Sequence, residues 1–378
     1  MTMVYHDYQG LKLSALGLGA MRLPVIDGDE SRIDESETEK LIGYAMEQGI
    51  NYYDTAWGYH GGHSEAVVGK ILSRYPRDSY YLSTKFPGYD LANMEKVEEI
   101  FEAQLKRCGV DYFDFYFFHN VSEPNIDAYL DKKYGIFAYL SKQKELGRIR
   151  HLGFSAHGGK KVLRRFLAAY GEHMEFGMLQ VNYLDWTFQE AKEKIELLSE
   201  YNVPVWVMEP LRGGRLANLP REQAEKLRNL RPEESVPAWA FRFLQSIPQV
   251  KMTLSGMSNF QQLRENIATY QTHRPLNDRE METLLGVAQD MLKNKILPCT
   301  GCKYCLNYCS QGLDIPMLLG LYNEHTFTEG GWLAGMVLES VPEDKHPSAC
   351  IGCKRCEEVC PQQIKISEAL ADFTEKLK

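Results

Sequence analysis

Eight of the nine cysteines lie between residues 299 and 360, in two sets with the same spacing. The sets read Cys299-x2-Cys302-x2-Cys305-x3-Cys309 and Cys350-x2-Cys353-x2-Cys356-x3-Cys360. In a reducing compartment such clustering favours metal binding over disulfide bonds. Three cysteines on a tight loop can hold one face of a cubane, while the fourth points away and binds a neighbouring cluster. The pattern therefore predicts two [4Fe-4S] clusters.

The spacing also predicts that the two sets exchange their last ligands. One cluster is expected on Cys299, Cys302, Cys305 and Cys360, and the other on Cys350, Cys353, Cys356 and Cys309. The alternative is a pair of zinc sites. Zinc more often takes two C-x2-C pairs from separate loops, so it fits less well. The first set ends in Ser310 where the second has Pro361, which constrains its backbone less.

Before the cysteines, short apolar runs alternate with amphipathic stretches in eight pairs. Strands are expected at Leu16–Gly19, Asn51–Asp54, Tyr81–Lys85, Phe113–Phe118, His151–Ser155, Leu179–Asn182, Val205–Met208 and Thr253–Ser255. Helices are expected at Glu37–Gln48, Ser64–Ser73, Glu95–Cys108, Ala128–Leu146, Lys160–Tyr170, Phe188–Tyr201, Arg221–Leu230 and Phe260–Tyr270, with further ones at Pro237–Gln245 and Asp278–Lys293. This alternation predicts a closed (β/α)8 barrel. A doubly wound open sheet is the alternative, disfavoured because no GxGxxG follows the first strand.

The sequence pattern changes near residue 295. Beyond it no strands are expected, and the chain carries cysteines and helical stretches at Ile315–Glu324 and Trp332–Glu339. We therefore expect a barrel domain over residues 1–294 and a small, mainly helical iron–sulfur domain over 295–378. Apart from the matched cysteine sets, no repeat is evident.

Charge and hydropathy exclude several partners. The net charge of -8 is spread along the chain, whereas nucleic-acid binding requires a basic face. No run of 18 apolar residues is present, and the N-terminus lacks the pattern of a signal peptide. We expect a cytoplasmic protein without a membrane or nucleic-acid partner. The ninth cysteine, Cys108, is expected to be a small buried apolar residue.

Four polar residues stand at the carboxyl ends of three successive strands, where barrel enzymes place their chemistry. They are Asp54, Tyr59, Lys85 and His119. A tyrosine is a weak acid with a pKa near 10, and a nearby ammonium lowers that value. Lys85, held by Asp54, is expected to do this for Tyr59, while His119 orients a carbonyl oxygen. The set predicts an acid that protonates oxygen while hydride reaches carbon.

These residues lie in segments that resemble the aldo-keto reductases over nearly all of residues 1–290. The resemblance rests on GLGAMR, NYYDTAWGY, STKF, FFHN, GRIRHLGFSAHG, QVNY, EPLRGG and SGMSNFQQLREN. It implies a TIM barrel, a catalytic tetrad of Asp54, Tyr59, Lys85 and His119 with Tyr59 as general acid, and a nicotinamide cofactor, usually NADPH.

The same resemblance implies a set of cofactor contacts. They are Gly19, Met21, Asp54, Ser155, Gln180, Met208, Pro210, Leu211, Gly213, Gly256, Ser258, Gln262 and Asn266. The sequence departs from the family where Ala156 replaces an asparagine, where Met208 replaces an aromatic residue, and where Gly256 and Gln262 replace basic residues. The family's usual cofactor and the nearby Arg264 favour NADP, but the loss of these basic residues weakens that preference, and NAD stays open.

The substrate pocket is expected to include Trp57 beside Tyr59 and His119, with Tyr89, Trp186 and His157 on neighbouring loops. The tail, with CTGCKYCLNYCSQGLDIP and CIGCKRCEEVCP, resembles a bacterial ferredoxin-type domain. Together the two parts resemble a branch of iron–sulfur aldo-keto reductases.

The leading hypothesis is an NAD(P)H-dependent oxidoreductase that reduces an aldehyde or ketone, or catalyses the reverse reaction. The alternative is an electron-transfer enzyme whose clusters exchange electrons with the barrel site or with a partner protein. Hydride carries two electrons and each cluster carries one, so this alternative requires a flavin or a radical-tolerant substrate. A third hypothesis is a redox sensor that binds the cofactor without reacting it.

Overall fold

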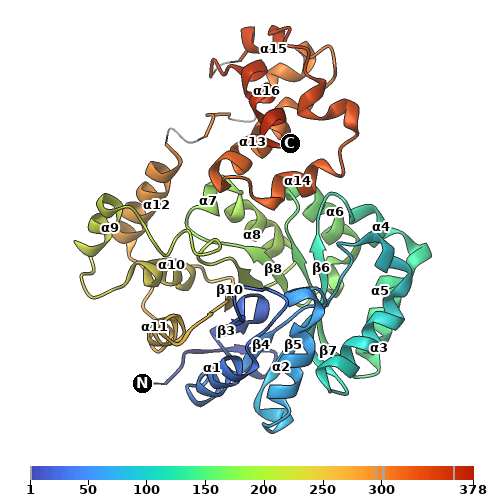
Figure 1. The fold of residues 1–378 in the computed structure, drawn as a ribbon, viewed down its shortest axis with the longest axis vertical. Helices are drawn as coiled ribbons and strands as arrows, with labels where there is room; N and C mark the ends of the chain where they lie inside the picture. The colour runs from blue at the N-terminus through green and yellow to red at the C-terminus, as the bar shows by residue number, and fades with distance from the viewer. Residues whose placement is uncertain (1, 294–295, 300–302, 361) are drawn as a thin grey trace. The chain divides into compact units, whose positions relative to one another are not determined.

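The computed structural model describes residues 2–293, 296–299, 303–360 and 362–378 (Figure 1). The chain forms two compact units, Met1–Leu285 and Gly286–Lys378. The boundary expected between residues 294 and 295 lies outside the described residues and stays a prediction. Cys302 and Pro361 also lie outside them.

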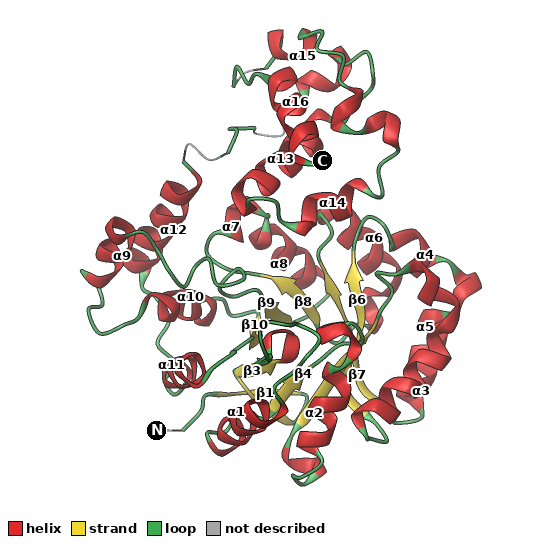
Figure 2. Ribbon diagram, in the orientation of Figure 1, coloured by secondary structure: helices red, strands yellow, loops and turns green. Residues whose placement is uncertain are grey.

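The first unit is built on a closed barrel of eight parallel strands in the order β10-β3-β4-β5-β6-β7-β8-β9 (Figure 2). The barrel strands are β3 (Leu16–Gly19), β4 (Tyr52–Asp54), β5 (Tyr81–Phe86), β6 (Phe113–Val121), β7 (Ile149–Ala156), β8 (Gly177–Gln180), β9 (Val205–Met208) and β10 (Val250–Ser255). All eight predicted strands are present, most with ends shifted by one to three residues. The predicted barrel is therefore confirmed, and the open sheet is excluded.

A short antiparallel hairpin precedes the barrel and was not predicted. It consists of β1 (Tyr5–Tyr8) and β2 (Leu11–Ser14). Its strands are too short and too polar to show a clear period. Tyr8 fixes the hairpin to the barrel core, where its ring lies 5.0 Å from Trp206 and 6.0 Å from Phe115.

The helices of this unit follow the strands, as in other (β/α)8 barrels. They are α1 (Glu35–Glu47), α2 (Ser64–Leu72), α3 (Val97–Cys108), α4 (Ile126–Leu130), α5 (Ile136–Glu145), α6 (Lys160–Tyr170), α7 (Asp185–Phe188), α8 (Ala191–Glu200), α9 (Arg221–Arg228), α10 (Val236–Gln245) and α11 (Phe260–Tyr270), with 3-10 turns at Ala20–Arg22, Tyr59–Gly62, Arg77–Ser79, Leu91–Lys96, Lys132–Tyr134 and Gly171–His173. The next helix, α12 (Asp278–Leu292), begins in the first unit and ends in the second.

Two predicted helices are each broken in two. The stretch 128–146 is interrupted because Asp131 caps a 3-10 turn and Gly135 takes a left-handed φ of 62°. The stretch 188–201 is interrupted at Glu190, whose φ is 54°. Left-handed backbone ends an α-helix, and only the glycine gives a sequence signal for it.

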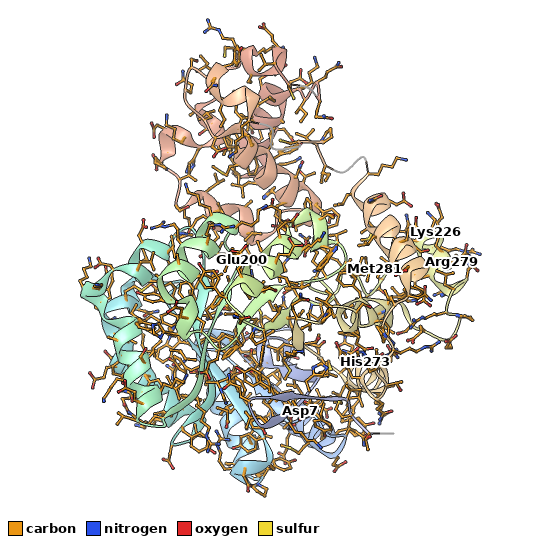
Figure 3. The ribbon with its side chains drawn as sticks, turned by 180° about the vertical axis from the view of Figure 1, so that it is seen from behind. Asp7, Glu200, Lys226, His273, Arg279 and Met281 are labelled. Atoms are coloured by element: carbon orange, nitrogen blue, oxygen red, sulfur yellow. The ribbon has the colours of Figure 1, made fainter. Side chains whose placement is uncertain are left out.

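The outer surface carries charged side chains on the helices. Glu200 and Arg279 are exposed, on α8 and α12, and Lys226 on α9 is partly exposed (Figure 3). Across the described ranges, none of the helices has the length and apolar character needed to cross a bilayer.

The second unit is mainly helical, as predicted. Its helices are α13 (Ile315–Thr328), α14 (Trp332–Leu338), α15 (Arg355–Glu358) and α16 (Ile366–Lys376), with 3-10 turns at Tyr304–Tyr308, Glu343–Lys345 and Pro347–Ala349. Its core contains Leu318, Leu370 and Phe373 together with the buried sulfurs of Cys305 and Cys356. Cysteine side chains and apolar residues therefore share one core.

The two cysteine sets belong to an internal structural repeat with an offset of 51 residues. Lys303 and Lys354 both take left-handed backbone, with φ of 66° and 62°. The hydrogen bond from the N–H of Gly312 to the carbonyl of Cys309 recurs from Gln363 to Cys360, each 3.0 Å long. The expectation that no repeat exists beyond the cysteines is therefore wrong. Outside the sets the repeat is conformational, because few of the paired side chains are identical.

Candidate functional site

The polar centre of the barrel is a buried pair between neighbouring strands. Asp54 ends β4, and Lys85 lies near the end of β5. The Lys85 Nζ donates to Asp54 Oδ1 at 2.6 Å and to the carbonyl of Thr55 at 2.7 Å. Ser83 donates to the other carboxylate oxygen at 2.7 Å. Both charged side chains are nearly inaccessible to solvent, and breaking such a buried pair is costly. The arrangement fixes the lysine in one position.

Tyr59 and His119 lie beside this pair. The Lys85 Nζ is 5.1 Å from the centre of the Tyr59 ring. The rings of Tyr59 and His119 are 6.2 Å apart and nearly perpendicular. Tyr89, from the next loop, packs edge-on against His119 at 5.2 Å. The structure therefore brings together all four residues of the predicted tetrad, and adds Tyr89 as a wall.

The ionisation of Tyr59 differs from the expectation. Burial raises the pKa of its phenol, the carboxylates of Asp54 and Glu209 raise it further, and Arg22 lowers it. The expected lowering of the Tyr59 pKa by Lys85 is therefore wrong in this structure. The positive charge of Lys85 is directed at Asp54, and the tyrosine stays protonated over the whole physiological pH range.

His119 is neutral for a similar reason. Burial lowers the pKa of its imidazole well below the usual value, and Lys85 and His157 lower it further. Its Nδ1 is buried without a hydrogen-bond partner. Burial also lowers the pKa of Lys85, against the opposing charge of Asp54. The centre thus combines a neutral acid with a neutral imidazole.

Most of the predicted cofactor contacts lie at the carboxyl ends of strands or just beyond them. Gly19 ends β3 and Met21 follows it, Ser155 and Gln180 lie in β7 and β8, Met208 ends β9 with Pro210, Leu211 and Gly213 beyond it, and Gly256 and Ser258 follow β10, with Gln262 and Asn266 on α11.

Some of these side chains are already engaged within the protein. The Ser155 hydroxyl accepts from the Asn120 N–H at 2.9 Å, and Gln180 donates to Asp185 at 2.8 Å. Asn266 is buried and donates to Ser255 at 3.2 Å, so it supports the end of β10. Gly213, Gly256, Ser258 and Gln262 are exposed.

Trp57, predicted to lie in the substrate pocket, is held by a cation–π contact. The Arg107 guanidinium lies 3.6 Å from the centre of the Trp57 ring. Arg107 in turn pairs with the buried carboxylate of Glu65 at 3.3 Å. Trp57 is therefore held by Arg107 on α3, which is itself held by Glu65 on α2.

Glu209 is a site residue that the sequence analysis missed. It follows β9 directly, takes a left-handed φ of 56°, and raises the pKa of Tyr59. The signal was a carboxylate placed immediately after the apolar strand VWVM.

In the second unit, cysteines from the two sets line shared cavities. One cavity is lined by Cys299, Cys305 and Cys360, together with Leu319 and Ile366. The other is lined by Cys309, Cys350, Cys353 and Cys356, with Leu370 and other residues. Each cavity thus combines most of one set with the last cysteine of the other.

The cysteine side chains lie in the walls of these two cavities. In the described ranges, no group of three or more Cys, His, Asp or Glu side chains is arranged to hold a metal ion. A cubane binds each cysteine at a different iron, so its ligands need to enclose a cavity. The donor set and the apolar walls therefore fit an iron–sulfur cluster better than a single zinc ion.

A parallel barrel with this polar centre defines an enzyme of the oxidoreductase class. Residues 15–288, more than half of the chain, match the model described as the aldo/keto reductase family, and the chain belongs to this family. Residues 298–366 match a 4Fe-4S dicluster domain. The two matches confirm the family resemblance in both parts of the chain.

Individual relatives are distant. The probable aldo-keto reductase 1 of Glycine max is 29% identical over 214 residues, which cover 54% of this chain and 58% of that protein. The NADH-specific methylglyoxal reductase of Escherichia coli is 27% identical, covering 68% of this chain and 90% of that protein.

A solved aldo-keto reductase from Klebsiella pneumoniae, in complex with NADPH, superimposes with a TM-score of 0.59 at 18% identity, covering 75% of this chain and 94% of that chain. At this identity the likeness supports the fold alone.

Proposed function

We propose that the barrel catalyses NAD(P)H-dependent reduction of an aldehyde or ketone to an alcohol, or the reverse reaction. The observation that carries the proposal is the assembly of Tyr59, His119 and the buried Lys85–Asp54 pair at one point of the barrel mouth. These are the groups needed to protonate a carbonyl oxygen beside a hydride donor.

Each residue has a defined part in this mechanism. Tyr59 is the general acid, and its raised pKa keeps the proton on the phenol until a carbonyl oxygen accepts it. Neutral His119 orients that oxygen by hydrogen bonding. Lys85, fixed by Asp54, packs against the Tyr59 ring with its Nζ 5.1 Å from the ring centre and so helps to hold the phenol in place. Trp57 and Tyr89 exclude water and bound the substrate. The bound nicotinamide supplies or accepts the hydride.

The strand-end residues support a dinucleotide extended across the mouth. Ser155 and Gln180 each keep hydrogen-bonding capacity for a carboxamide. Met208, which ends β9, is the residue proposed to pack against the nicotinamide ring. Exposed Ser258 and Gln262 flank the start of α11, whose N-terminal end favours phosphate.

NADP is the proposed cofactor, with NAD as the alternative. The named relatives include an NADH-specific enzyme and a protein solved with NADPH. Arg264 places a cation on α11 over the Tyr44 and Phe260 rings. Gly256 and Gln262 contribute no charge, so Arg264 is the main reason for favouring the phosphorylated form.

We further propose that the tail binds two [4Fe-4S] clusters with the exchanged ligands expected from the spacing. The cavities support this ligand set, since each joins the last cysteine of one set to the other set. Cys302 is assigned to the first site from the spacing of the cysteines alone. The clustered cysteines also support a reducing compartment, and we propose the cytoplasm.

Substitution of Tyr59 by phenylalanine tests the enzymatic proposal. Y59F should lower kcat for carbonyl reduction by at least about 100-fold, because the acid is lost while the ring is kept. Cofactor binding, measured by quenching of tryptophan fluorescence, should stay within about twofold. The matched control is Y89F, which removes a hydroxyl from the wall and should retain most of the activity. Full turnover by Y59F would refute the proposed role.

A second candidate function is electron exchange between the clusters and a partner protein. Cys353, a proposed ligand, is exposed, as is the neighbouring Ile351. A cluster held there lies near the protein surface, which favours access by an external carrier. Substrate turnover driven by dithionite in the absence of NAD(P)H would support this candidate, and its absence would leave the nicotinamide reaction alone.

A further inference from the structure

The loop after β9 has an unusual backbone. Glu209, Arg212, Gly213 and Gly214 have φ values of 56°, 48°, 63° and 90°, all in the left-handed region. Two of these residues are not glycine, and such strain is retained mainly at functional sites. Successive left- and right-handed residues turn backbone N–H groups toward one side, which forms a concavity that binds anions.

The anion in this concavity is the chain's own carboxylate. The N–H of Gly213 donates to the side chain of Glu209. A Cβ built on Gly213 would lie 3.8 Å from Glu209 Oε2, so the carboxylate folds back over the loop. The Glu209 carbonyl accepts from the Arg212 N–H and from Asn182 Nδ2, each at 3.0 Å. These bonds hold the residue in its strained conformation.

The surrounding charges do not neutralise this carboxylate fully. The Arg212 Nε donates to both Asp185 oxygens at 3.0 Å, so its charge is shared with another carboxylate. Arg22, in the 3-10 turn that follows β3, is the other cation that acts on Glu209. The charge of Glu209 also raises the pKa of Tyr59. Glu209 therefore interacts with both the loop and the proposed acid.

We propose that Glu209 occupies the diphosphate position of the cofactor site as an internal anion, and that a dinucleotide binds only when this carboxylate is protonated or displaced. The inference rests on the proposed function, which assigns Pro210, Leu211 and Gly213 to the diphosphate. A carboxylate and a diphosphate cannot share the same N–H donor, and their charges repel at close range. Glu209 is thus a positioning residue that sets cofactor affinity.

A pH dependence follows. Burial raises the pKa of Glu209, Asp185 acts in the same direction, and Arg22, Arg212 and the Gly213 N–H oppose it. An incoming diphosphate raises the pKa further, so binding takes up a proton. Affinity should therefore increase as the pH falls below the pKa of Glu209 in the bound state, and level off below its pKa in the free protein.

The test measures dissociation constants of NADPH, ADP-ribose and adenosine by titration calorimetry at pH 6 and pH 8. In E209Q, NADPH and ADP-ribose should bind about tenfold more tightly than in the wild type at pH 8, with the difference reduced at pH 6. Adenosine, which lacks the diphosphate, should bind equally to both. E209S, which also removes the charge, should behave as E209Q if the glutamine variant folds poorly.

The matched control is E190Q. Glu190 is also left-handed, with φ of 54°, but pairs with Lys160 on the exposed surface. The E190Q substitution removes the same charge, and this variant should bind NADPH, ADP-ribose and adenosine with the affinities of the wild type. Unchanged or weaker ADP-ribose binding in E209Q and E209S would overturn this inference while leaving the proposed function intact. Failure of every form to bind NADPH or NADH would overturn both.

Discussion

At Glu175, burial and hydrogen bonding act on the same carboxylate in opposite directions. Burial raises its pKa, but His151, Lys144 and the N–H of Leu152 donate to it and hold the value at about 2, against an ordinary 4.5. The Leu152 bond is 3.0 Å long, and the His151 contact is 3.1 Å. The Glu175 carboxylate links segments that are distant in sequence. Its ionised form accepts these hydrogen bonds and therefore stabilises the folded state.

This carboxylate should contribute measurably to stability. Because the pKa is lower in the folded state, the contribution is present above about pH 4.5 and is lost as the pH falls toward 2. E175Q should lower the free energy of unfolding of the barrel by up to about 3 kcal/mol at pH 7. Urea unfolding followed by tryptophan fluorescence at pH 7 and pH 3 measures the difference, which should shrink at the lower pH.

Glu102 provides the control for this prediction. It pairs with Arg148 at 2.7 Å on the surface, where its side chain is 50% exposed. Exposed pairs contribute little, so E102Q should change the free energy of unfolding by less than about 1 kcal/mol. Equal losses in E175Q and E102Q would show that burial of Glu175 has no special effect.

The residues that form the site could be predicted from the sequence, but their protonation states could not. Asp54, Lys85 and His119 could be placed because parallel strands bring their carboxyl ends to one edge. The raised pKa of Tyr59 depends on how closely the protein surrounds the phenol and on Glu209, which approaches from another strand. Neither the burial of the phenol nor the approach of Glu209 can be predicted from a periodic pattern or a motif spacing in the sequence.

At the scale of elements, periodicity predicted the barrel strands and their order. It failed where local conformation departs from a regular period. The helix expected over 128–146 breaks at Gly135, and the one expected over 188–201 breaks at Glu190. The repeat in the second unit escaped notice because it is carried by matched backbone conformations, such as those of Lys303 and Lys354.

The repeat gives a direct test of ligand exchange. C309S removes a cysteine from the first set, but its cavity partners are the cysteines of the second set. The second cluster should therefore be lost. Anaerobic alkylation followed by peptide mapping should label Cys350, Cys353 and Cys356, while Cys299 and Cys305 stay protected by their iron.

C360S should give the mirror result, with labelling of the first set and protection of the second. C108S is the control, because Cys108 is buried in the barrel and should not affect either cluster. Labelling of the first set in C309S would show that each set closes its own cluster, and would refute the exchange.

At the scale of the whole molecule, the two units depend on different forces. The barrel unit has an extensive apolar core of its own, including Phe115, Trp206 and Met252. The second unit buries far fewer large apolar side chains, and Cys305 and Cys356 form part of its core. Small domains with thin cores commonly need disulfides or metals to fold. The clusters are therefore expected to act first as structural links.

Removal of iron should unfold the second unit and spare the barrel. Without iron, the cavity-lining thiols lose the links that join the two halves of the repeat, and the remaining apolar contacts are too few to offset the chain entropy. Hydrogen exchange followed by mass spectrometry, before and after anaerobic chelation, should show loss of amide protection in α13 and α16. The barrel strands β4 to β7 should keep theirs, and NADPH binding should persist. Protection retained in α13 and α16 after complete iron removal would show that apolar packing alone is sufficient, and would refute the structural role of the clusters.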